Sequence, residues 1–253
     1  MKKVLGSMRQ ADEDFGLIQA DDRIAVGVSG GKDSTLLLYA MKLYQYFCPQ
    51  PFTFCGIMLD MGYPEFDPTP LTTFCEREDI LLHVVPTDIK KVVFDIRQES
   101  HPCALCAKLR RGALYRTARF LGCNKVALGH HMDDALETFL LCMFYEGRLH
   151  TFSPKSYLDR ANVTLIRPMI YLGEKHVIHM VNKKKLPVLH NPCPANGYTK
   201  RQDMKELITN LCKSNPKARE QMLGALKNVP QYDLWDDVYQ GERPRRRSRG
   251  GHT

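Results

Sequence analysis

The sequence has no apolar run long enough to cross a membrane, and its first residues, MKKVLGSMRQADEDFG, contain no hydrophobic stretch typical of a secretory signal. These absences argue against membrane-spanning and secreted proteins, so we expect a cytoplasmic one. In that reducing compartment the nine cysteines are expected to be core thiols, metal ligands or catalytic groups rather than disulfides. With 253 residues, 43% of them hydrophobic, the chain can bury a core without disulfides.

Acidic residues are the minority among the charged ones, with 28 against 36 basic residues and a formal charge of +8. Residues 241–253 contain five arginines and one glutamate, so this tail supplies half of the excess. A basic excess suits a phosphate-rich partner such as RNA. A solvated, disordered tail is equally compatible with the composition, and both interpretations stay open here.

Apolar, β-branched segments alternate along the chain with helical ones. Strands are expected over 23–28, 52–60, 80–86, 124–131 and 163–170. Helices are expected over 34–47, 104–122, 133–147, 173–185, 200–213 and 216–229. This alternation predicts a parallel sheet covered by helices on both faces, with ligands at the carboxyl ends of the strands.

The turn after the first strand has neither the GxxxxGK[ST] nor the GxGxxG spacing of common nucleotide-binding loops. It contains instead Ser29, Gly30, Gly31, Lys32, Asp33 and Ser34. Glycines let backbone N–H groups approach an anion, the following helix adds its partial positive charge, and a lysine can neutralise phosphate. A simple glycine-rich turn with a Ser or Asp cap is the alternative. We interpret the turn as a site for nucleotide phosphates.

SGGKDS resembles the signature of the PP-loop ATP pyrophosphatases. The resemblance implies that ATP is cleaved between its α and β phosphates, that a carbonyl oxygen is adenylated, and that a nucleophile then displaces AMP. It also implies that the loop grips the pyrophosphate part of ATP.

A second polar cluster, GHHMDD (129–134), follows the strand predicted over 124–131 and opens a helix. Adjacent carboxylates there can cap the helix or coordinate the magnesium ion of ATP. Asp60, at the end of the second strand, can contact the nucleotide or begin a turn before Gly62. We expect these groups to share one edge of the sheet with the glycine-rich turn.

A cysteine pair, Cys103 and Cys106, opens the helix predicted over 104–122. Thiols three residues apart share one side of a helical turn, and the helix start and nearby basic residues predict lowered thiol pKa values. A redox pair, half of a zinc site or part of an iron–sulfur site all fit. Cys193 with His101 or His190 would complete a zinc site. The remaining cysteines are expected to be inert: Cys48, Cys55, Cys75, Cys123, Cys142 and Cys212.

The segment CALCAKLRRGALYRTARFLGCNKVALGHHMDDALETFLLCMFYEGRL resembles the central part of tRNA 2-thiocytidine synthetases. The likeness runs from the PP-loop through RPMIY (167–171) and NPC…RQ (191–202), over most of the chain. It implies a Rossmann-like, HUP-type α/β fold: a parallel sheet flanked by helices, with a small helical C-terminal region. It also implies a [4Fe–4S] cluster, ATP, Mg²⁺ and a tRNA substrate.

The resemblance assigns roles residue by residue. It implies catalytic roles for Asp133, Asp134 and Arg111. It implies ATP contacts by Ser29, Gly30, Gly31, Lys32, Asp33, Ser34, Asp60, Gly129 and His130. Cluster ligation falls to Cys103, Cys106 and Cys193. Independently of the resemblance, basic side chains are candidate contacts for RNA phosphates, namely Lys108, Arg110, Lys183, Lys184 and Lys185. Three thiolates would leave one iron open to bind the sulfur that is transferred.

The sequence departs from the family where many relatives have P-C-x-x-C, because Asn196 replaces the second cysteine. Cys193 is then the only local candidate for the third ligand. Its Cys-Pro pair also resembles the tRNA 2-thiouridine synthases, but the paired zinc-finger cysteines usual at both ends of those proteins are missing.

We therefore expect an ATP-dependent enzyme that thiolates C2 of a cytidine, at position 32 of the tRNA anticodon loop. The sulfur donor is expected to be of the cysteine desulfurase type, no membrane partner is expected, and a homodimer stays open. Two alternative reactions stay open, thiouridine formation and lysidine-type ligation. A third alternative is a non-catalytic RNA-binding module that responds to a metal or to redox state. The expected organisation is a nucleotide-binding domain over 1–190, a helical part over 191–240 and a disordered tail over 241–253.

Overall fold

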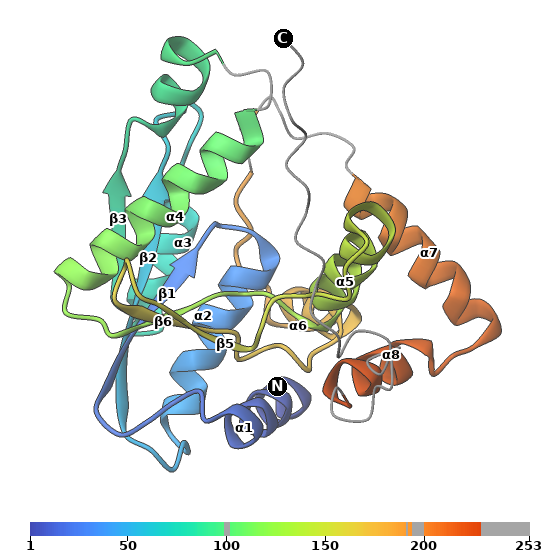
Figure 1. Cartoon of the computed structure of the whole chain (residues 1–253). Coiled ribbons are helices and arrows are strands. Elements are labelled where there is room, and N and C mark those ends of the chain that lie inside the picture. Colours follow the sequence, from blue (N-terminus) through green and yellow to red (C-terminus); the bar gives the residue numbers. More distant parts are fainter. Residues whose placement is uncertain (99–101, 191, 194–199, 229–253) are drawn as a thin grey trace, which may run out of the picture.

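The computed structural model describes residues 1–98, 102–190, 192–193 and 200–228, and its centre is a six-stranded sheet (Figure 1). Across the sheet the strand order is β3-β2-β1-β4-β6-β5. The strands are β1 (Asp22–Val28), β2 (Phe52–Asp60), β3 (Leu82–Pro86), β4 (Lys125–Ala127), β5 (Lys155–Leu158) and β6 (Val163–Ile166). All neighbours pair in parallel except β5, which runs antiparallel to β6. The predicted α/β fold is confirmed, and the expectation of a wholly parallel sheet is wrong at this one edge.

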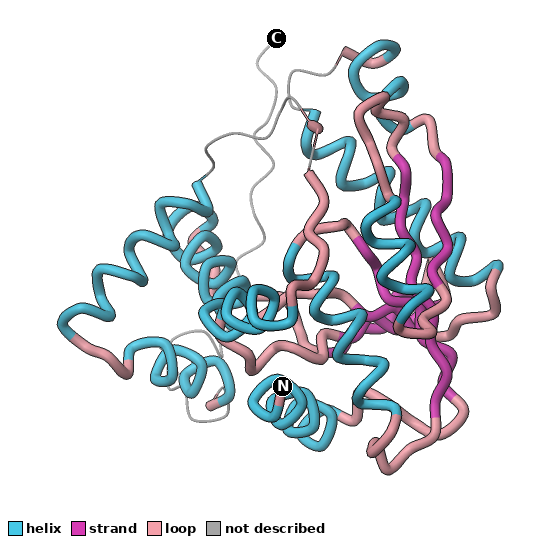
Figure 2. Tube along the Cα trace, turned by 180° about the vertical axis from the view of Figure 1, so that it is seen from behind, coloured by secondary structure: helices cyan, strands magenta, loops and turns pink. Residues whose placement is uncertain are grey.

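Helices cover both faces of the sheet (Figure 2). They are α1 (Lys2–Phe15), α2 (Lys32–Gln45), α3 (Thr69–Arg77), α4 (Pro102–Phe120), α5 (Met132–Glu146), α6 (Glu174–Lys184), α7 (Lys200–Ser214) and α8 (Ala218–Lys227), with a π-helical turn η1 (Lys91–Ile96). Within the described part of the chain, no helix combines the length and apolar character that crossing a bilayer requires.

The alternation of side chains along β1 explains why both faces are covered. Ile24 and Val26 lie in the larger apolar cluster, together with side chains of α1, α2, α3 and α6. Ala25 points to the opposite face, where Leu114 and Ala118 of α4 cover it. A parallel strand buried on both faces shows this continuous apolar pattern, which is why the sequence indicates β1 so clearly.

The C-terminal helices pack on α5 rather than on the sheet. Met204 and Ile208 of α7 join Leu136 and Leu140 of α5 in a third apolar cluster, to which side chains of α8 contribute. This gives the helical C-terminal region that the resemblance implies. The boundary at residues 190 and 191 stays a prediction, and the tail 241–253 lies outside the described residues.

Several element boundaries differ from the predicted ones. The strand predicted over 163–170 ends at Ile166, because Arg167 and the following proline turn the chain away from the sheet. The strand predicted over 124–131 is reduced to β4, and its remaining residues form the loop that enters α5. The strand β5 and the helices α1 and α3 were not predicted.

Candidate active site

The strand order reverses between β1 and β4, and this reversal brings two predicted motifs together. The chain continues from β1 to β2 on one side and from β4 to β6 on the other. Loops that follow two such parallel neighbours diverge and leave a crevice at the carboxyl edge, where ligands bind in open α/β sheets. The loop after β1 carries the predicted phosphate turn, and the loop after β4 carries GHHMDD. The expectation that they share one edge is confirmed.

The PP-loop (Ser29–Ser34) is closed by its own hydroxyl groups. The Ser34 hydroxyl donates to the Gly31 carbonyl at 3.0 Å and accepts from the Ser29 N–H at 3.1 Å. Gly31 is the residue before α2, and Lys32 is the first residue of that helix. The first N–H groups of a helix have no intrahelical acceptor and favour anions. The loop therefore has the local geometry of a phosphate site.

Gly30 is required by both its conformation and its neighbour. Its φ is 80°, in the left-handed region that disfavours side chains. A Cβ atom there would lie 3.0 Å from the side chain of Leu189, whose backbone N–H donates to the Gly30 carbonyl at 2.9 Å. The segment that leads to Cys193 is thereby attached to the PP-loop.

Gly129 has a packing role at the same edge. A Cβ atom on it would lie 3.0 Å from the backbone of Asp33 and Ser34. The loop after β4 thus touches the first turn of α2 directly. A side chain here would crowd the α2 backbone, so glycine suits this close approach, and any contact of Gly129 with ATP stays a prediction.

Lys32 lies in a network of charges rather than in open solvent. Its ammonium group is 3.0 Å from Asp33 and 3.2 Å from Glu174, which also pairs with Lys205 of α7 at 2.8 Å. Burial opposes the charged form, but the two carboxylates prevail and raise the pKa of Lys32. A bound phosphate would therefore compete with Asp33 and Glu174 for this charge.

His131 connects the two loops. Its Nε2 lies 3.5 Å from an Asp33 oxygen, and its Nδ1 accepts the Asp134 N–H at 3.4 Å. The Asp134 carboxylate accepts the His131 N–H at 2.9 Å, which completes a capping box at the start of α5. Burial would lower the pKa of His131, but the bond to Asp33 and the nearby carboxylates raise it.

Asp133 and Asp134, predicted as catalytic or magnesium ligands, both have protein partners. The buried Asp133 accepts the Glu174 N–H at 2.7 Å through one oxygen and Arg219 Nε at 2.8 Å through the other. Asp134 accepts a bond from Arg201 at 3.2 Å. Asp133 therefore joins the starts of α5 and α6 to α8, and its proposed catalytic role stays a prediction.

The two arginines of the C-terminal helices were missed by the sequence analysis. Arg201 of α7 also bonds Glu137 and Thr138 of α5. It stands within the resembling segment NPC…RQ, which was the available signal. Arg219 of α8 has no such signal, since its role depends wholly on the packing of α8.

His130, predicted to contact ATP, lies beside a buried arginine. Arg167 Nε donates to His130 Nδ1 at 3.3 Å, and the His130 ring lies 4.9 Å from the ring of Phe152. Burial, followed by the positive charge of Arg167, lowers the pKa of His130 to about 4. The imidazole is therefore neutral at physiological pH.

The three predicted cluster ligands come from two distant segments, and Cys106 lies within electrostatic range of both Cys103 and Cys193. Cys103 and Cys106 are in the first turns of α4, whereas Cys193 follows the segment held by Gly30. Burial raises the pKa of Cys106; Arg110 lowers it, and the thiols of Cys193 and Cys103 raise it further. The net shift is upward, so the predicted lowering of the thiol pKa is wrong for Cys106.

The described side chains do not form a closed metal site. Within residues 1–98, 102–190, 192–193 and 200–228, no three His, Cys, Asp or Glu side chains converge on one point. His101 and Asn196 lie outside those ranges, and His190 is exposed. The chemistry of the donors, three thiols from α4 and the segment after Leu189, still fits an iron–sulfur cluster.

Tyr63, which the sequence analysis missed, adds a polar group to this region. Its side chain is buried, and its hydroxyl lies within interaction distance of the Cys193 thiol. Burial, followed by the thiols of Cys193 and Cys106, raises its pKa. A hydroxyl donor beside thiols suits a site where thiolate or sulfide accepts hydrogen bonds. No sequence signal marks Tyr63, because it lies in the irregular segment after β2.

The other predicted residues are more dispersed. Asp60 accepts the Gly62 N–H at 2.8 Å, so its carboxylate stabilises the turn after β2. Arg111 is exposed on α4. Burial raises the pKa of the neighbouring Tyr115, and the positive charge of Arg111 partly offsets that rise. Lys108 and Arg110 are exposed near the cysteines, but Lys183, Lys184 and Lys185 lie at the end of α6. That end is about 15 Å along the helix from Glu174, so the structure does not bring these lysines to the site.

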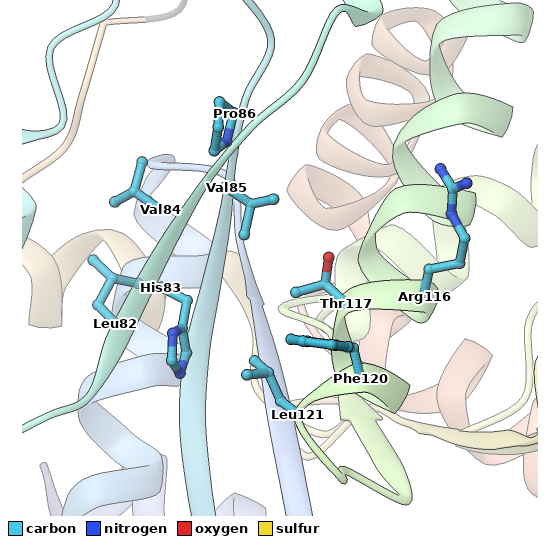
Figure 3. Close-up of a pocket in the computed structure, with 9 residues that line it drawn as sticks. All are labelled: Leu82, His83, Val84, Val85, Pro86, Arg116, Thr117, Phe120 and Leu121. Atoms are coloured by element: carbon cyan, nitrogen blue, oxygen red, sulfur yellow. The ribbon is translucent and has the colours of Figure 1, made fainter.

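A surface groove of about 580 Å³ lies apart from these groups, between β3 and the end of α4 (Figure 3). It is lined by Leu82, His83, Val84, Val85, Pro86, Arg116, Thr117, Phe120 and Leu121. None of the predicted site residues lines it.

Comparisons with known proteins show the family to which the chain belongs. The PP-loop domain family matches residues 3–211. The chain is 39% identical to the tRNA-cytidine(32) 2-sulfurtransferase of Geobacter sulfurreducens, covering 92% of both chains. It is 38% identical to the enzyme of the same name from Pelobacter propionicus, covering 95% of this chain and 90% of the relative.

Solved structures agree on the fold. The U34-tRNA thiolase NcsA of Methanococcus maripaludis, determined with its [4Fe-4S] cluster, superposes with a TM-score of 0.71 at 21% identity. The match covers 88% of this chain and 77% of that one. The NH3-dependent NAD synthetase of Campylobacter jejuni superposes with a TM-score of 0.51 at 14% identity, covering 96% of both chains. From the domain match and the identity over nearly the whole chain, the protein belongs to the PP-loop family of tRNA-cytidine(32) 2-sulfurtransferases.

Proposed function

We propose that this protein replaces the C2 oxygen of cytidine 32 in tRNA by sulfur at the expense of ATP. The observation that carries the proposal is the attachment of the Cys193 segment to the PP-loop through Leu189 and Gly30. This attachment holds the Cys193 segment beside the phosphate-binding turn, which supports a site where ATP and the cysteine ligands are neighbours. Relatives that share about 38% of their residues with this chain carry the corresponding name.

The chemistry divides into two displacements. The C2 oxygen of the cytidine attacks the α-phosphorus of ATP, a new P–O bond forms, and the bond to the β-phosphate breaks with loss of pyrophosphate. Sulfide then donates an electron pair to C2 and loses its proton, and the C2–O bond breaks with loss of AMP, so the sulfur stays at the sulfide oxidation level and no oxidant or reductant is needed. The backbone N–H groups at the start of α2 and the charge of Lys32 stabilise the departing pyrophosphate.

Two inorganic cofactors complete the proposal. Cys103, Cys106 and Cys193 would hold the [4Fe–4S] cluster, which supplies an iron that can carry the sulfur. Mg²⁺ binds proteins through one or two carboxylates together with substrate phosphates, so it would enter with ATP. Asp33 and Asp134 are the proposed carboxylates, because each is less buried than Asp133.

Substrate tRNA is expected to contact the exposed cations of α4, Lys108 and Arg110, which lie close to the cysteines. Contacts from Lys183, Lys184 and Lys185 would need a tRNA that reaches the end of α6. A cysteine desulfurase as the sulfur source and a homodimer both stay predictions, as does the cytoplasmic location.

The experiment compares Cys103→Ala, Cys106→Ala and Cys193→Ala with Cys142→Ala, a buried thiol of α5 away from the site. Each protein is reconstituted anaerobically with iron and sulfide. We expect the first three to lose cluster absorbance and tRNA thiolation together, while binding of an ATP analogue persists. The control should retain all three properties. Wild-type protein that binds about one zinc ion, no iron, and yet thiolates tRNA would refute the cluster assignment.

The same reaction mixture tests the alternatives. Thiouridine instead of thiocytidine in the tRNA would favour the U34 thiolase reaction of the structural neighbour. ATP consumption without a sulfur requirement would favour lysidine-type ligation. A protein that binds tRNA but never consumes ATP would be a non-catalytic RNA-binding module.

A further inference from the structure

Arg167 is a buried cation at the carboxyl edge of the sheet. It follows β6 directly and is only 7% exposed. One terminal nitrogen, Nη1, donates to the Ser153 carbonyl, and the guanidinium lies over the Phe152 ring, 4.7 Å from its centroid. With Nε bonded to His130, the other terminal nitrogen, Nη2, makes no hydrogen bond to any residue that the structure describes.

The charge of Arg167 has no counterion among the described residues. No aspartate or glutamate there lies within salt-bridge distance, and the one group that favours its charged form is the hydroxyl of Tyr115. Buried charges in folded proteins are normally paired, because an unpaired one retains its full desolvation cost. Because the described residues leave this guanidinium without a counterion, we look to a ligand for the opposite charge.

His130 supplies a second donor in the same place. Its Nδ1 accepts the Arg167 Nε–H, so the proton of the neutral ring is on Nε2. Both side chains pack on the same ring, that of Phe152. Two N–H donors, Arg167 Nη2 and His130 Nε2, are thus held by one aromatic platform. Arg167 is 7% exposed and His130 is partly exposed, so both side chains retain some access to solvent.

We propose that Arg167 Nη2 and His130 Nε2 bind a phosphate oxygen of the substrates while the cytidine is adenylated. The phosphate can come from two sources, the α-phosphate of ATP or the backbone of the tRNA. Gly129, the neighbour of His130, touches the first turn of α2, and this proximity to the PP-loop favours ATP. The donors hold non-bridging oxygens throughout: the P–O bond to the cytidine forms, the α–β bond breaks, and no proton moves between them and the substrate.

This inference deepens the proposed function and rests on it for the identity of the reaction. Binding, however, can be measured without turnover. The variant Arg167→Met replaces the cation by an apolar side chain of similar length in the anaerobically reconstituted full chain. The matched control is Arg160→Met, an exposed arginine in the turn before β6, at the opposite end of that strand.

Three quantities are measured for each protein: affinity for α,β-methylene-ATP without tRNA, affinity for tRNA without nucleotide, and melting temperature. We expect Arg167→Met to weaken nucleotide binding by about ten- to a hundredfold, the range for hydrogen bonds to charged groups. Its melting temperature should be unchanged or higher, because replacing an unpaired buried charge by an apolar group is often stabilising. Arg167→Lys, which keeps the charge but not the planar fork, should bind with intermediate affinity.

A loss of tRNA affinity alone would identify the bound phosphate as that of the RNA backbone. Unchanged affinity for both ligands in Arg167→Met would overturn the inference, as would wild-type affinity in Arg167→Lys if the methionine variant does not fold. Failure of the wild-type protein to thiolate tRNA would instead refute the proposed function, and the binding comparison would still stand.

Discussion

The His130 imidazole should make the folded protein less stable as the pH falls below 7. Burial and the adjacent guanidinium of Arg167 depress its pKa from 6.5 to about 4, while Asp134 acts in the opposite direction and Arg201 and His131 add to the depression. In the unfolded chain the ring has its ordinary pKa near 6.5. Between these values the unfolded state binds a proton that the folded state rejects, so stability is lost as the pH falls through this window.

The size of the effect follows from the two pKa values. Linkage between protonation and folding gives a loss of about 2 kcal/mol between pH 7 and pH 5 for this one group. Other groups also titrate over this range, so the informative quantity is the difference between two proteins. The variant His130→Gln cannot titrate, and it should lack this part of the pH dependence whatever its absolute stability.

Urea denaturation of wild-type protein and His130→Gln at pH 7 and pH 5 measures the difference. We expect the wild type to lose about 2 kcal/mol more than the variant on acidification. Arg167→Met should show a smaller loss than the wild type, because it removes the second cause of the low pKa. The same pH dependence in wild type and His130→Gln would refute the assignment of a half-buried, neutral His130.

Three further predictions concern the PP-loop, the hydrogen bonds of Asp133 and the basic C-terminal tail. Gly31 has an extended backbone and space for a Cβ atom, so Gly31→Val should fold normally but lose tRNA-dependent AMP release; normal release would contradict a phosphate site there. Asp133→Ala removes the acceptor of the Glu174 N–H and of Arg219, so denaturation should show a free energy of unfolding lower by about 2–4 kcal/mol. A variant as stable as the wild type would show that these bonds contribute little. Deleting residues 243–253 should weaken tRNA binding at low salt and spare thiolation, and loss of thiolation would show a specific role for the tail.

The sequence predicts those parts of the site that depend on one strand and the turn that follows it. The PP-loop could be located because β1 is a buried apolar run that ends in two glycines and a helix. GHHMDD follows β4 in the same way. Alternation of strands and helices then suffices to predict that both turns share the carboxyl edge of the sheet.

Contacts between distant segments could not be predicted in this way. Arg167 was mentioned only as part of the motif RPMIY and was given no role. Its burial could not be predicted, because it depends on Phe152 and Ser153 at the antiparallel edge of the sheet. Asp133 looks like a free carboxylate in the sequence because its partners, Glu174 and Arg219, come from α6 and α8. The strand β5 was missed because four residues are too few to show a period.

The cysteine group lies between these two cases. The pair in α4 is visible as a local spacing, and family resemblance added Cys193. The structure adds the physical link, the bond from Leu189 to Gly30 that attaches the Cys193 segment to the PP-loop. It also corrects the pKa argument, because burial outweighs the charge of Arg110 at Cys106.

The most direct test of the central claim is nucleoside mass spectrometry of unmodified tRNA after incubation with the anaerobically reconstituted protein, ATP and a sulfur source. The account predicts 2-thiocytidine at position 32, formed only when ATP is present and accompanied by AMP. It also predicts that Cys193→Ala abolishes the product while leaving ATP-analogue binding intact. Two results would contradict the account. One is that cytidine 32 stays unmodified although the protein carries its cluster and ATP and the sulfur source are present. The other is that Cys193→Ala forms as much 2-thiocytidine as the wild-type protein.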